Sequence, residues 1–275
     1  MKHKFLFILL FSLVLEGMVT TQAVAGDYVH QVNTLIGTKG TGLTSGYLYP
    51  GATYPYGMVQ FTPSYFSKRS GFVINQLSGG GCEHMGNFPT FPVKGKLKMS
   101  PDNILNYRIN VSEEKGHAGY YEAMVQEDIK AKLTVTERTG MASYEYPADQ
   151  QYGTIIIGGG ISATPIEQAA IVITAPNKCE GYAEGGNFCG LRTPYKVYFV
   201  AEFDTDAFET GTWKREELMP NTTFAEGEYS GVYFTFDVNK KKNIQYKIGV
   251  SYVSVENARE NLKAENAEWD FQKIQ

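Results

Sequence analysis

A residue period of two recurs along most of this chain and limits the folds that it can adopt. Residues 130–137 alternate strictly, with Ala131, Leu133 and Val135 on one face and polar side chains on the other. The same alternation recurs in 232–237 and 244–251. Successive side chains of a β-strand point to opposite faces, so this pattern predicts half-buried strands of the kind that pair antiparallel.

Three further segments are apolar at almost every position and are expected to be strands covered on both faces, as in the middle of two packed sheets. They are 155–157, 170–173 and 197–203. No helix of three turns is indicated before the C-terminus, which excludes a βαβ arrangement. We therefore expect an all-β fold in which antiparallel sheets pack as a sandwich over residues 26–254.

The period changes at the C-terminus. In 255–275 the apolar residues fall at spacings of three and four with charged residues between them, which predicts an amphipathic helix. This helix would carry Trp269 and Phe271 near its end, with no later element to cover them. We expect it to be a linker helix that leads toward a further part of the protein.

Composition agrees with an all-β protein and narrows the class of partner. The chain has 19 Tyr, 16 Phe and 29 Gly, which suits strands joined by tight turns. Its net charge is only −4 with both signs scattered, so there is no basic stripe for nucleic acid and no polybasic patch for a membrane surface. Aromatic richness without basic charge suits a sugar or protein partner better.

The first 25 residues have the form of a secretory signal peptide. A basic start, MKHK, precedes the apolar run FLFILLFSLVL, which is too short to span a bilayer, and Ala23 to Ala25 form an A-x-A cleavage pattern. We expect cleavage after Ala25 and export to the periplasm or the cell exterior. No later stretch has eighteen continuous apolar residues, so no membrane span is expected after cleavage.

A glycine-rich stretch, Leu77 to Gly95, reads LSGGGCEHMGNFPTFPVKG and is the candidate site. The three glycines of 79–81 let another group approach the backbone closely. Polar side chains follow at Cys82, Glu83, His84 and Asn87. Pro89 and Pro92 stiffen the exit and predict that no central strand forms there. A rigid loop with polar side chains is typical of a functional site, but a glycine-rich surface turn with a solvated Glu and His explains the composition equally well.

The segment before this loop is rich in tyrosine. Glycine and proline interrupt it every few residues, so it is expected to be a long ordered loop that leads into one short strand, Met58 to Phe61. Its aromatic residues are Tyr47, Tyr49, Tyr54 and Tyr56. They suit a platform for sugar stacking, but packing of the loop onto a sheet is the favoured interpretation.

Several kinds of chemistry are not supported. The histidines beyond the signal, His30, His84 and His117, do not define a metal site, and no G-x-S-x-G elbow is present. A thiol nucleophile at Cys82 would need His84 as its base from two residues away, where facing geometry is hard to obtain. The glycines of 158–160 do not open a helix, so they indicate a turn rather than a phosphate loop. No carboxylate pair stands out as an acid and base.

Three cysteines, Cys82, Cys179 and Cys189, are an odd number for an exported chain. At most one disulfide can form among them. Their spacing matches no zinc pattern.

Several segments together resemble the amino-terminal domain of glycoside hydrolase family 92, the exo-acting α-mannosidases. They occur in family order and are VNTLIGT, PGATYPYGMVQFTPS, LSGGGCEHMGNFPTFPVKG, HAGYYEAMV, GGNFCG and KIGVSYVSVENARENLKAENAEWDF. They span nearly the whole chain after the signal. The elements GCEHMGNFP and NFCG resemble the branch of the family with an FCG motif.

The resemblance implies a β-supersandwich of the galactose-mutarotase-like type that packs on a larger helical (α/α) barrel, with an inverting mechanism and a bound calcium ion. In this family the catalytic acid and base and most calcium ligands lie on the helical domain. The resemblance therefore implies that this chain is the non-catalytic half of an exported α-mannosidase, with no catalytic or metal-binding residue of its own and no calcium when alone. Its implied partners are the helical catalytic domain and a mannose-containing glycan. The alternative is a stand-alone carbohydrate-binding or adhesin-like module.

The resemblance also implies which residues line the leaving-group side of the active site. They are Gly80, Gly81, Cys82, Glu83, His84 and Asn87 of the glycine-rich loop, with Arg69 and Ser70 of the segment before it. This chain departs from many members in three places: the segment Tyr65 to Phe72 lacks a tryptophan, Ile74 to Gln76 replace a Ser-His-Thr-His run, and Glu83 to Met85 replace an Asp-Tyr pair. These departures leave the mannosidic linkage and the leaving-group sugar unassigned.

Two structural expectations follow from this resemblance. Cys82 and Cys189 lie in the two glycine-bounded cysteine motifs, and we expect the two loops to meet near the site, with Cys179 further off. A disulfide between them requires Cα atoms within about 7 Å. We also expect exposed apolar surface beside the glycine-rich loop and around Trp269 and Phe271, where the helical domain would pack.

Overall fold

The computed structural model describes residues 28, 31–38, 48–64, 71–77, 79, 82–102, 107 and 110–275. The chain divides into two compact units, residues 1–31 and 32–275, and of the first unit only Tyr28 and Gln31 are described. The expected signal peptide, 1–25, lies outside the described residues. So do Arg69, Ser70, Gly80, Gly81 and Tyr47.

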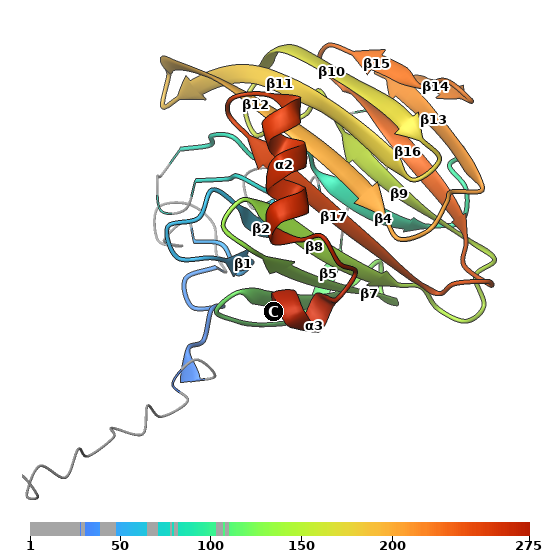
Figure 1. The fold of residues 1–275 in the computed structure, drawn as a ribbon, viewed down its shortest axis with the longest axis horizontal. Helices are drawn as coiled ribbons and strands as arrows, with labels where there is room; N and C mark the ends of the chain where they lie inside the picture. The colour runs from blue at the N-terminus through green and yellow to red at the C-terminus, as the bar shows by residue number, and fades with distance from the viewer. Residues whose placement is uncertain are drawn as a thin grey trace, which may run out of the picture. The chain divides into compact units, whose positions relative to one another are not determined.

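The second unit consists mainly of β-strands, shown in chain order by colour in Figure 1. They are β1 (Ala52–Thr53), β2 (Gln60–Pro63), β3 (Phe72–Val73), β4 (Thr90–Lys94), β5 (Val111–His117), β6 (Tyr120–Val125), β7 (Ile129–Val135), β8 (Thr139–Glu145), β9 (Tyr152–Gly158), β10 (Ile166–Ala175), β11 (Lys178–Phe188), β12 (Leu191–Phe203), β13 (Glu209–Lys214), β14 (Glu217–Pro220), β15 (Phe224–Glu226), β16 (Ser230–Asp237) and β17 (Asn243–Ser251). The short strand expected at Met58 to Phe61 begins two residues later, as β2.

These strands form two sheets, of eight and nine strands. The first has the order β1-β2-β3-β4-β9-β16-β13-β14, and the second has the order β15-β10-β11-β12-β17-β8-β7-β6-β5. Neighbouring strands pair antiparallel throughout both sheets, for example β16 with β9 and β17 with β8. The predicted all-β antiparallel sandwich is therefore confirmed.

Aromatic rings from the two sheets meet in one core. Phe203 of the nine-stranded sheet contacts Phe234 and Phe236 of the eight-stranded sheet, with ring centroids 4.8 and 5.1 Å apart. Phe72 stacks on Tyr144 across the sheets at 6.2 Å. On β7 the alternation predicted from the sequence is present, because the apolar face is buried in this core and the lysines between are only half-buried.

The outer face of β16 is covered, which differs from the half-exposed strand that its alternation predicts. Tyr233 and Thr235 alternate with the core residues of β16, yet both are buried. Residues 95–102 account for this burial, because they bond to neighbouring strands of the sheet. Thr154 donates from Oγ1 to the backbone oxygen of Gly95 at 2.7 Å, and Trp213 donates from Nε1 to that of Asp102 at 3.0 Å. The covering layer comes from a remote segment, which a local period cannot indicate.

The reverse difference occurs on β10. Residues 170–173 are apolar throughout and predict a strand covered on both faces, but only Ile171 and Ile173 are buried. Ala170 and Val172 are half-buried. β10 lies one strand from the edge of its sheet, beside the three-residue β15, so its outer face receives less cover.

A strand also forms where the prolines predict none. β4 contains Pro92 and lies between β3 and β9, and it pairs with β9 along its whole length. β3 has only two residues and pairs with β4 at Thr90 alone, so among the described residues no strand bonds to that side of β4 at Pro92. Proline is tolerated there as it is on an edge strand, because no N–H is required. The prediction is wrong for this local reason.

Two helices follow the sheets, α2 (Val255–Glu265) and α3 (Phe271–Ile274), where one continuous helix over 255–275 was expected. Figure 1 shows α2 lying across the nine-stranded sheet over β12 and β17. Ala258 and Leu262 pack there on Val200. Gly249 permits this approach, because a Cβ at that position would lie 2.5 Å from the backbone oxygen of Ala258. No helix in the described part of the chain is long and apolar enough to cross a bilayer.

The end of the chain folds back onto the sheet, so the expected apolar exposure around Trp269 and Phe271 is wrong. Phe271 is only 7% exposed and packs edge-on against Tyr120 with ring centroids 6.2 Å apart. Trp269 is half-buried, with the ammonium of Lys247 4.3 Å from its ring centroid. The turn between α2 and α3 makes this possible, because it returns α3 to β7 and β8.

The packing of α2 leads to a first prediction. Leu262→Ala should lower the free energy of unfolding by about 2–5 kcal/mol, because it removes buried contacts and leaves a cavity. Lys263→Ala, on the exposed side of the same helix, should change it by less than about 0.5 kcal/mol. Urea unfolding followed by circular dichroism measures both, and equal losses in the two variants would contradict the packing.

Candidate functional site

The glycine-rich loop between β3 and β4 has a backbone that needs external support. Among its described residues, Gly79, Met85, Gly86 and Phe88 have φ angles of 71°, 58°, 74° and 53°, in the left-handed region. Glycine adopts this region freely, but for a residue with a side chain it costs about 1–2 kcal/mol. Two of these four residues have side chains, so tertiary contacts must hold the loop in place.

A disulfide between Cys82 and Cys189 is the first of these contacts. The two Cα atoms are 5.4 Å apart, so the expected pairing is confirmed. Cys189 lies in the turn between β11 and β12, and the disulfide therefore fixes the loop to the tip of this hairpin. A thiol nucleophile at Cys82 is excluded by this bond. Cys179 is free and buried in the core, and burial raises the pKa of its thiol.

Two asparagines form the second contact. The backbone N–H of Asn87 donates to Oδ1 of Asn75 at 2.8 Å, and Nδ2 of Asn75 donates to Oδ1 of Asn87 at 3.0 Å. Tyr195 on β12 donates from its hydroxyl to the same Oδ1 of Asn87 at 2.9 Å. Burial raises the pKa of Tyr195 to about 12, so this hydroxyl keeps its proton at neutral pH. Both asparagines are buried, which shields these bonds from water.

A polar floor lies under the loop. Gln76 is buried and lies directly against Gly86. A Cβ added to Gly86 would be 3.8 Å from the side-chain amide carbon of Gln76. Among the groups that the structure describes, neither polar atom of the Gln76 amide has a hydrogen-bond partner, and nor does Nδ2 of Asn87. An amide both donates and accepts hydrogen bonds, so this floor suits small groups that do the same, such as water or a hydroxyl.

His84 is packed rather than solvated. Its side chain is only 6% exposed and lies against Phe188 and Tyr195, with ring centroids 5.3 and 5.6 Å away. Nδ1 of His84 is 3.3 Å from the backbone oxygen of Asn187. The alternative of a surface turn with a solvated histidine is therefore wrong, since His84 braces the loop against the β11–β12 hairpin.

Glu83 is the carboxylate of the loop and is only half-buried. Burial raises the pKa of Tyr49, and the nearby charge of Glu83 adds to that shift. The Tyr49 hydroxyl donates to the backbone oxygen of Leu77, which fixes this tyrosine against the loop. Tyr49 thus follows the packing interpretation, whereas Tyr54 and Tyr56 are exposed and accessible for stacking.

The structure describes half of the predicted substrate-binding residues and brings them together. Within the loop, Cys82 and Glu83 are half-buried, whereas His84 and Asn87 face the protein interior. The other predicted residues, Arg69, Ser70, Gly80 and Gly81, lie outside the described residues.

Sequence reasoning missed three residues that hold the loop: Asn75, Tyr195 and Tyr252. Asn75 could have been noticed from the sequence, because Ile74 to Gln76 replace the Ser-His-Thr-His run that many family members have at this place. The two tyrosines carry no such signal, because Tyr195 reaches Asn87 across 108 residues and Tyr252 reaches Asn75 across 177.

Exposed apolar side chains flank the loop. A Cβ on Gly79 would lie 4.0 Å from a methyl carbon of Leu48, and the Tyr252 hydroxyl is 3.9 Å from Sδ of Met85. Five exposed apolar residues lie near the loop, either by sequence position or through contacts of this kind. They are Leu48, Leu77, Leu191, Tyr252 and Val253. Exposed apolar side chains therefore lie beside the loop, and whether they form one continuous surface stays a prediction.

The described residues do not fit a calcium ion on their own. They contain no group of three or more His, Cys, Asp or Glu side chains arranged to hold a metal. Calcium takes about six to eight oxygen ligands, several of them usually carboxylates. A calcium site in this region would need ligands from elsewhere.

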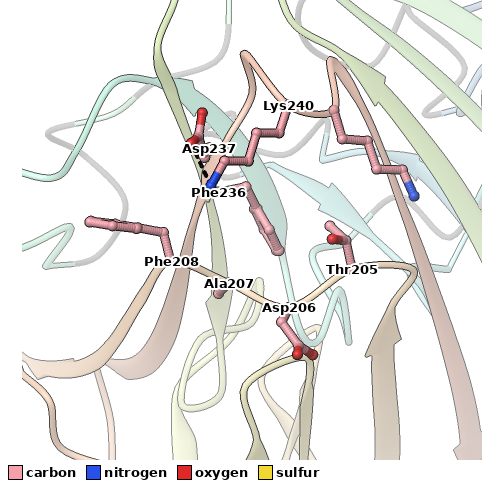
Figure 2. Close-up of a pocket in the computed structure, with 8 residues that line it drawn as sticks. Thr205, Asp206, Ala207, Phe208, Phe236, Asp237 and Lys240 are labelled. Atoms are coloured by element: carbon pink, nitrogen blue, oxygen red, sulfur yellow. Dashed lines mark ion pairs between the residues drawn. The ribbon is translucent and has the colours of Figure 1, made fainter.

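A separate pocket lies at the connection between β12 and β13 (Figure 2). Its volume is about 140 Å³, below the roughly 300–1,000 Å³ of typical ligand sites. Lys240 pairs with Asp237 at 3.3 Å, and Figure 2 shows the Phe208 ring directed away from the pocket. A small pocket with this internally neutralised charge is less suited to a ligand than the glycine-rich loop.

The chain is similar to a known family of proteins. The model of the glycosyl hydrolase family 92 N-terminal domain matches residues 31–251. An uncharacterized secreted glycosidase of Arthroderma benhamiae is 25% identical over 305 residues, which cover 96% of this chain and 39% of the relative. The chain thus spans 39% of the length of this curated relative.

Two solved structures share the fold. The gh92 family glycosyl hydrolase ccman5 matches with a TM-score of 0.78 and 22% identity, over 90% of this chain and 36% of its own. The family GH92 alpha-mannosidase BT3965 from Bacteroides thetaiotaomicron matches with a TM-score of 0.76 and 24% identity, also over 90% and 36%. At this identity the likeness establishes the fold alone.

The disulfide can be tested by removing it. Replacing both Cys82 and Cys189 by Ala should lower the free energy of unfolding by about 2–5 kcal/mol, because the bond closes a long loop and so restricts the unfolded chain. Cys179→Ala is the matched control and should cost only about 1 kcal/mol. Urea unfolding measures both, and a double variant as stable as the control would contradict a structural role.

The asparagine pair can be tested by a double-mutant cycle. Asn75→Leu and Asn87→Leu should each lower the free energy of unfolding by about 1–3 kcal/mol. Asn75→Leu leaves the buried N–H of Asn87 without its acceptor, and Asn87→Leu removes an acceptor of the buried Asn75 amide. The double variant should lose less than the sum of the two, by about 1 kcal/mol or more, because the bond between the two side chains is lost in each single variant but only once in the double variant. Strictly additive losses in urea unfolding would show that the two amides are not coupled.

Proposed function

The chain belongs to glycosyl hydrolase family 92, as its N-terminal domain, and from this membership we propose that it forms the non-catalytic part of an exported α-mannosidase. A solved relative with the same fold is an alpha-mannosidase, which supports this substrate class. The proposed substrate is a mannose-containing glycan. The single observation that carries the proposal is the glycine-rich loop, which is braced from several sides yet keeps one carboxylate, Glu83, partly accessible.

The proposed partner is a helical catalytic domain that packs on the surface around this loop. The exposed side chains of Leu77, Tyr252 and Val253 supply apolar area that such a domain would cover. The solved relatives are much longer than this chain, since it corresponds to 36% of each, and the remaining length has room for that domain.

We place the catalytic acid, the catalytic base and most calcium ligands on the helical domain. Inverting hydrolysis needs an acid that protonates the leaving oxygen and a carboxylate about 6.5–9.5 Å away that activates water.

Within this proposal the loop residues have two different roles. Glu83 and the backbone of Gly80 and Gly81 line the leaving-group side, together with Arg69 and Ser70. Cys82, His84 and Asn87 hold that surface in place. Their disulfide, ring contacts and buried hydrogen bonds support this second role.

Export to the periplasm or the cell exterior is part of the same proposal. A disulfide between Cys82 and Cys189 suits an oxidising compartment. One relative is a secreted glycosidase, which supports the same location.

A stand-alone carbohydrate-binding module is the second candidate. Tyr54 is exposed and Tyr56 is fully exposed, and such rings can stack on sugars. This candidate differs from the first in requiring useful affinity without a catalytic partner.

The two candidates separate in an experiment on purified residues 26–275. We expect no release of mannose from an α-mannoside, with or without calcium, and no retention on immobilised mannan. Retention that is lost in Tyr56→Ala but kept in Tyr56→Phe would favour the binding module, because stacking needs the ring and not the hydroxyl. Calcium-dependent release of mannose by this chain alone would overturn the assignment of catalysis to a partner domain.

A chain extended by the coding sequence downstream of Gln275 tests the role of the loop. If a helical domain follows, Glu83→Gln should lower kcat/KM for an α-mannoside by about tenfold or more, the effect of losing one charged contact to the substrate. Glu216→Gln, in the exposed turn between β13 and β14, is the matched control and should leave kcat/KM unchanged. Equal activity of the two variants would remove Glu83 from the site.

A further inference from the structure

Tyr252 links the glycine-rich loop to the segment that leads into α2. It lies between the end of β17 at Ser251 and the N-cap of α2 at Ser254. Nδ2 of Asn75 donates to its hydroxyl at 3.4 Å, and the same hydroxyl is 3.9 Å from Sδ of Met85. One side chain at the start of the helical segment therefore contacts both the loop and the asparagine that holds the loop.

The bonds to Asn87 orient the Asn75 amide, and Tyr252 contacts the amide in that orientation. This amide uses its oxygen to accept from the N–H of Asn87 and one hydrogen of Nδ2 to reach Oδ1 of Asn87. Its second Nδ2 hydrogen reaches the Tyr252 hydroxyl. Turning the amide over would exchange oxygen and nitrogen and break both bonds to Asn87. The hydroxyl of Tyr252 accepts a further bond from the amide in the orientation that holds the loop.

Tyr252 itself lies between two well-fixed elements. On one side β17 pairs with β8 and β12. On the other side Ser254 accepts through Oγ from the N–H of Asn257 at 3.1 Å, and Asn261 donates to the backbone oxygen of Val250 at 2.8 Å. The segment that carries Tyr252 is therefore held by the sheet on one side and by α2 on the other.

We infer that Tyr252 is a positioning residue that makes the conformation of the glycine-rich loop depend on the docking of α2. The purpose of this coupling rests on the proposed function, because a catalytic domain that contacts α2 would then also set the loop that lines its active site. The coupling itself is a property of this chain alone. It is reciprocal, so a change in the loop also shifts the start of α2.

Hydrogen exchange of the Asn87 N–H tests the coupling without any measurement of activity. Tyr252→Phe keeps the ring and removes the hydroxyl, and it should speed exchange of this N–H by about three- to tenfold through local opening. Tyr56→Phe is the matched control, since its ring is fully exposed, and it should have no effect. Asn75→Ala should speed exchange at least as much as Tyr252→Phe. If Tyr252→Phe behaves like Tyr56→Phe while Asn75→Ala opens the loop, the inference is overturned.

A second variant alters the helix without touching the loop. Ser254→Ala removes the N-cap of α2 and should speed exchange of the Asn87 N–H as well as that of the first α2 amides, and Ser254→Asp, which can still cap, should restore both. Exchange should depend little on dilute urea, which identifies local opening rather than global unfolding. Faster exchange in α2 with an unchanged Asn87 N–H, or exchange that follows global unfolding in every variant, would refute the coupling. Loss of the proposed mannosidase role would change none of these measurements, so the two failures can be told apart.

Discussion

Burial of aromatic rings between the two sheets is the interaction on which the rest of this structure depends. Each ring removed from water contributes about 1.5–3 kcal/mol, and Phe203, Phe234 and Phe236 alone bring three of them into contact across the sheets. The same packing places the candidate site. Phe88, the residue after Asn87, is buried against Phe199 of β12 with ring centroids 4.2 Å apart. The core therefore also fixes the loop beside β12, in addition to its polar contacts.

The contacts that then hold the loop act in different ways. The disulfide between Cys82 and Cys189 restricts the unfolded chain and brings the loop to the β11–β12 hairpin. The bonds between Asn75 and Asn87 act in the folded state, where they compensate for a backbone that Met85 and Phe88 would not adopt alone. Because His84 and Asn87 are buried and brace the loop whereas Glu83 is only half-buried, substitutions at Glu83 should have little effect on the fold.

Features that depend on neighbouring residues could be predicted from the sequence, whereas features that depend on remote segments could not. The alternation of Ala131, Leu133 and Val135 predicts β7 correctly, because the face of a strand is set by its own residues. Burial of Tyr233 on β16 could not be predicted, because the cover comes from residues 95–102. The disulfide followed from the family resemblance, since spacing left three possible pairings. The role of Asn75 needed the structure, because its partners lie 12 and 177 residues away.

The helical segment after the sandwich is fixed at both ends, and this determines what it can do. Beyond the Tyr252 contact at its start, the end of α2 is held by Lys247, which donates to the backbone oxygens of Asn266 and Ala267 at 2.9 and 3.0 Å. The ammonium thus faces the negative end of the helix dipole, although burial lowers the pKa of Lys247. Glu265 accepts from Thr136 Oγ1 at 2.6 Å and from the Arg138 N–H at 2.8 Å. A helix bound in this way is no flexible tether. The nine-stranded sheet would fix the orientation of any domain that continued from α3. The glycine-rich loop and that domain would then be held in fixed positions relative to each other.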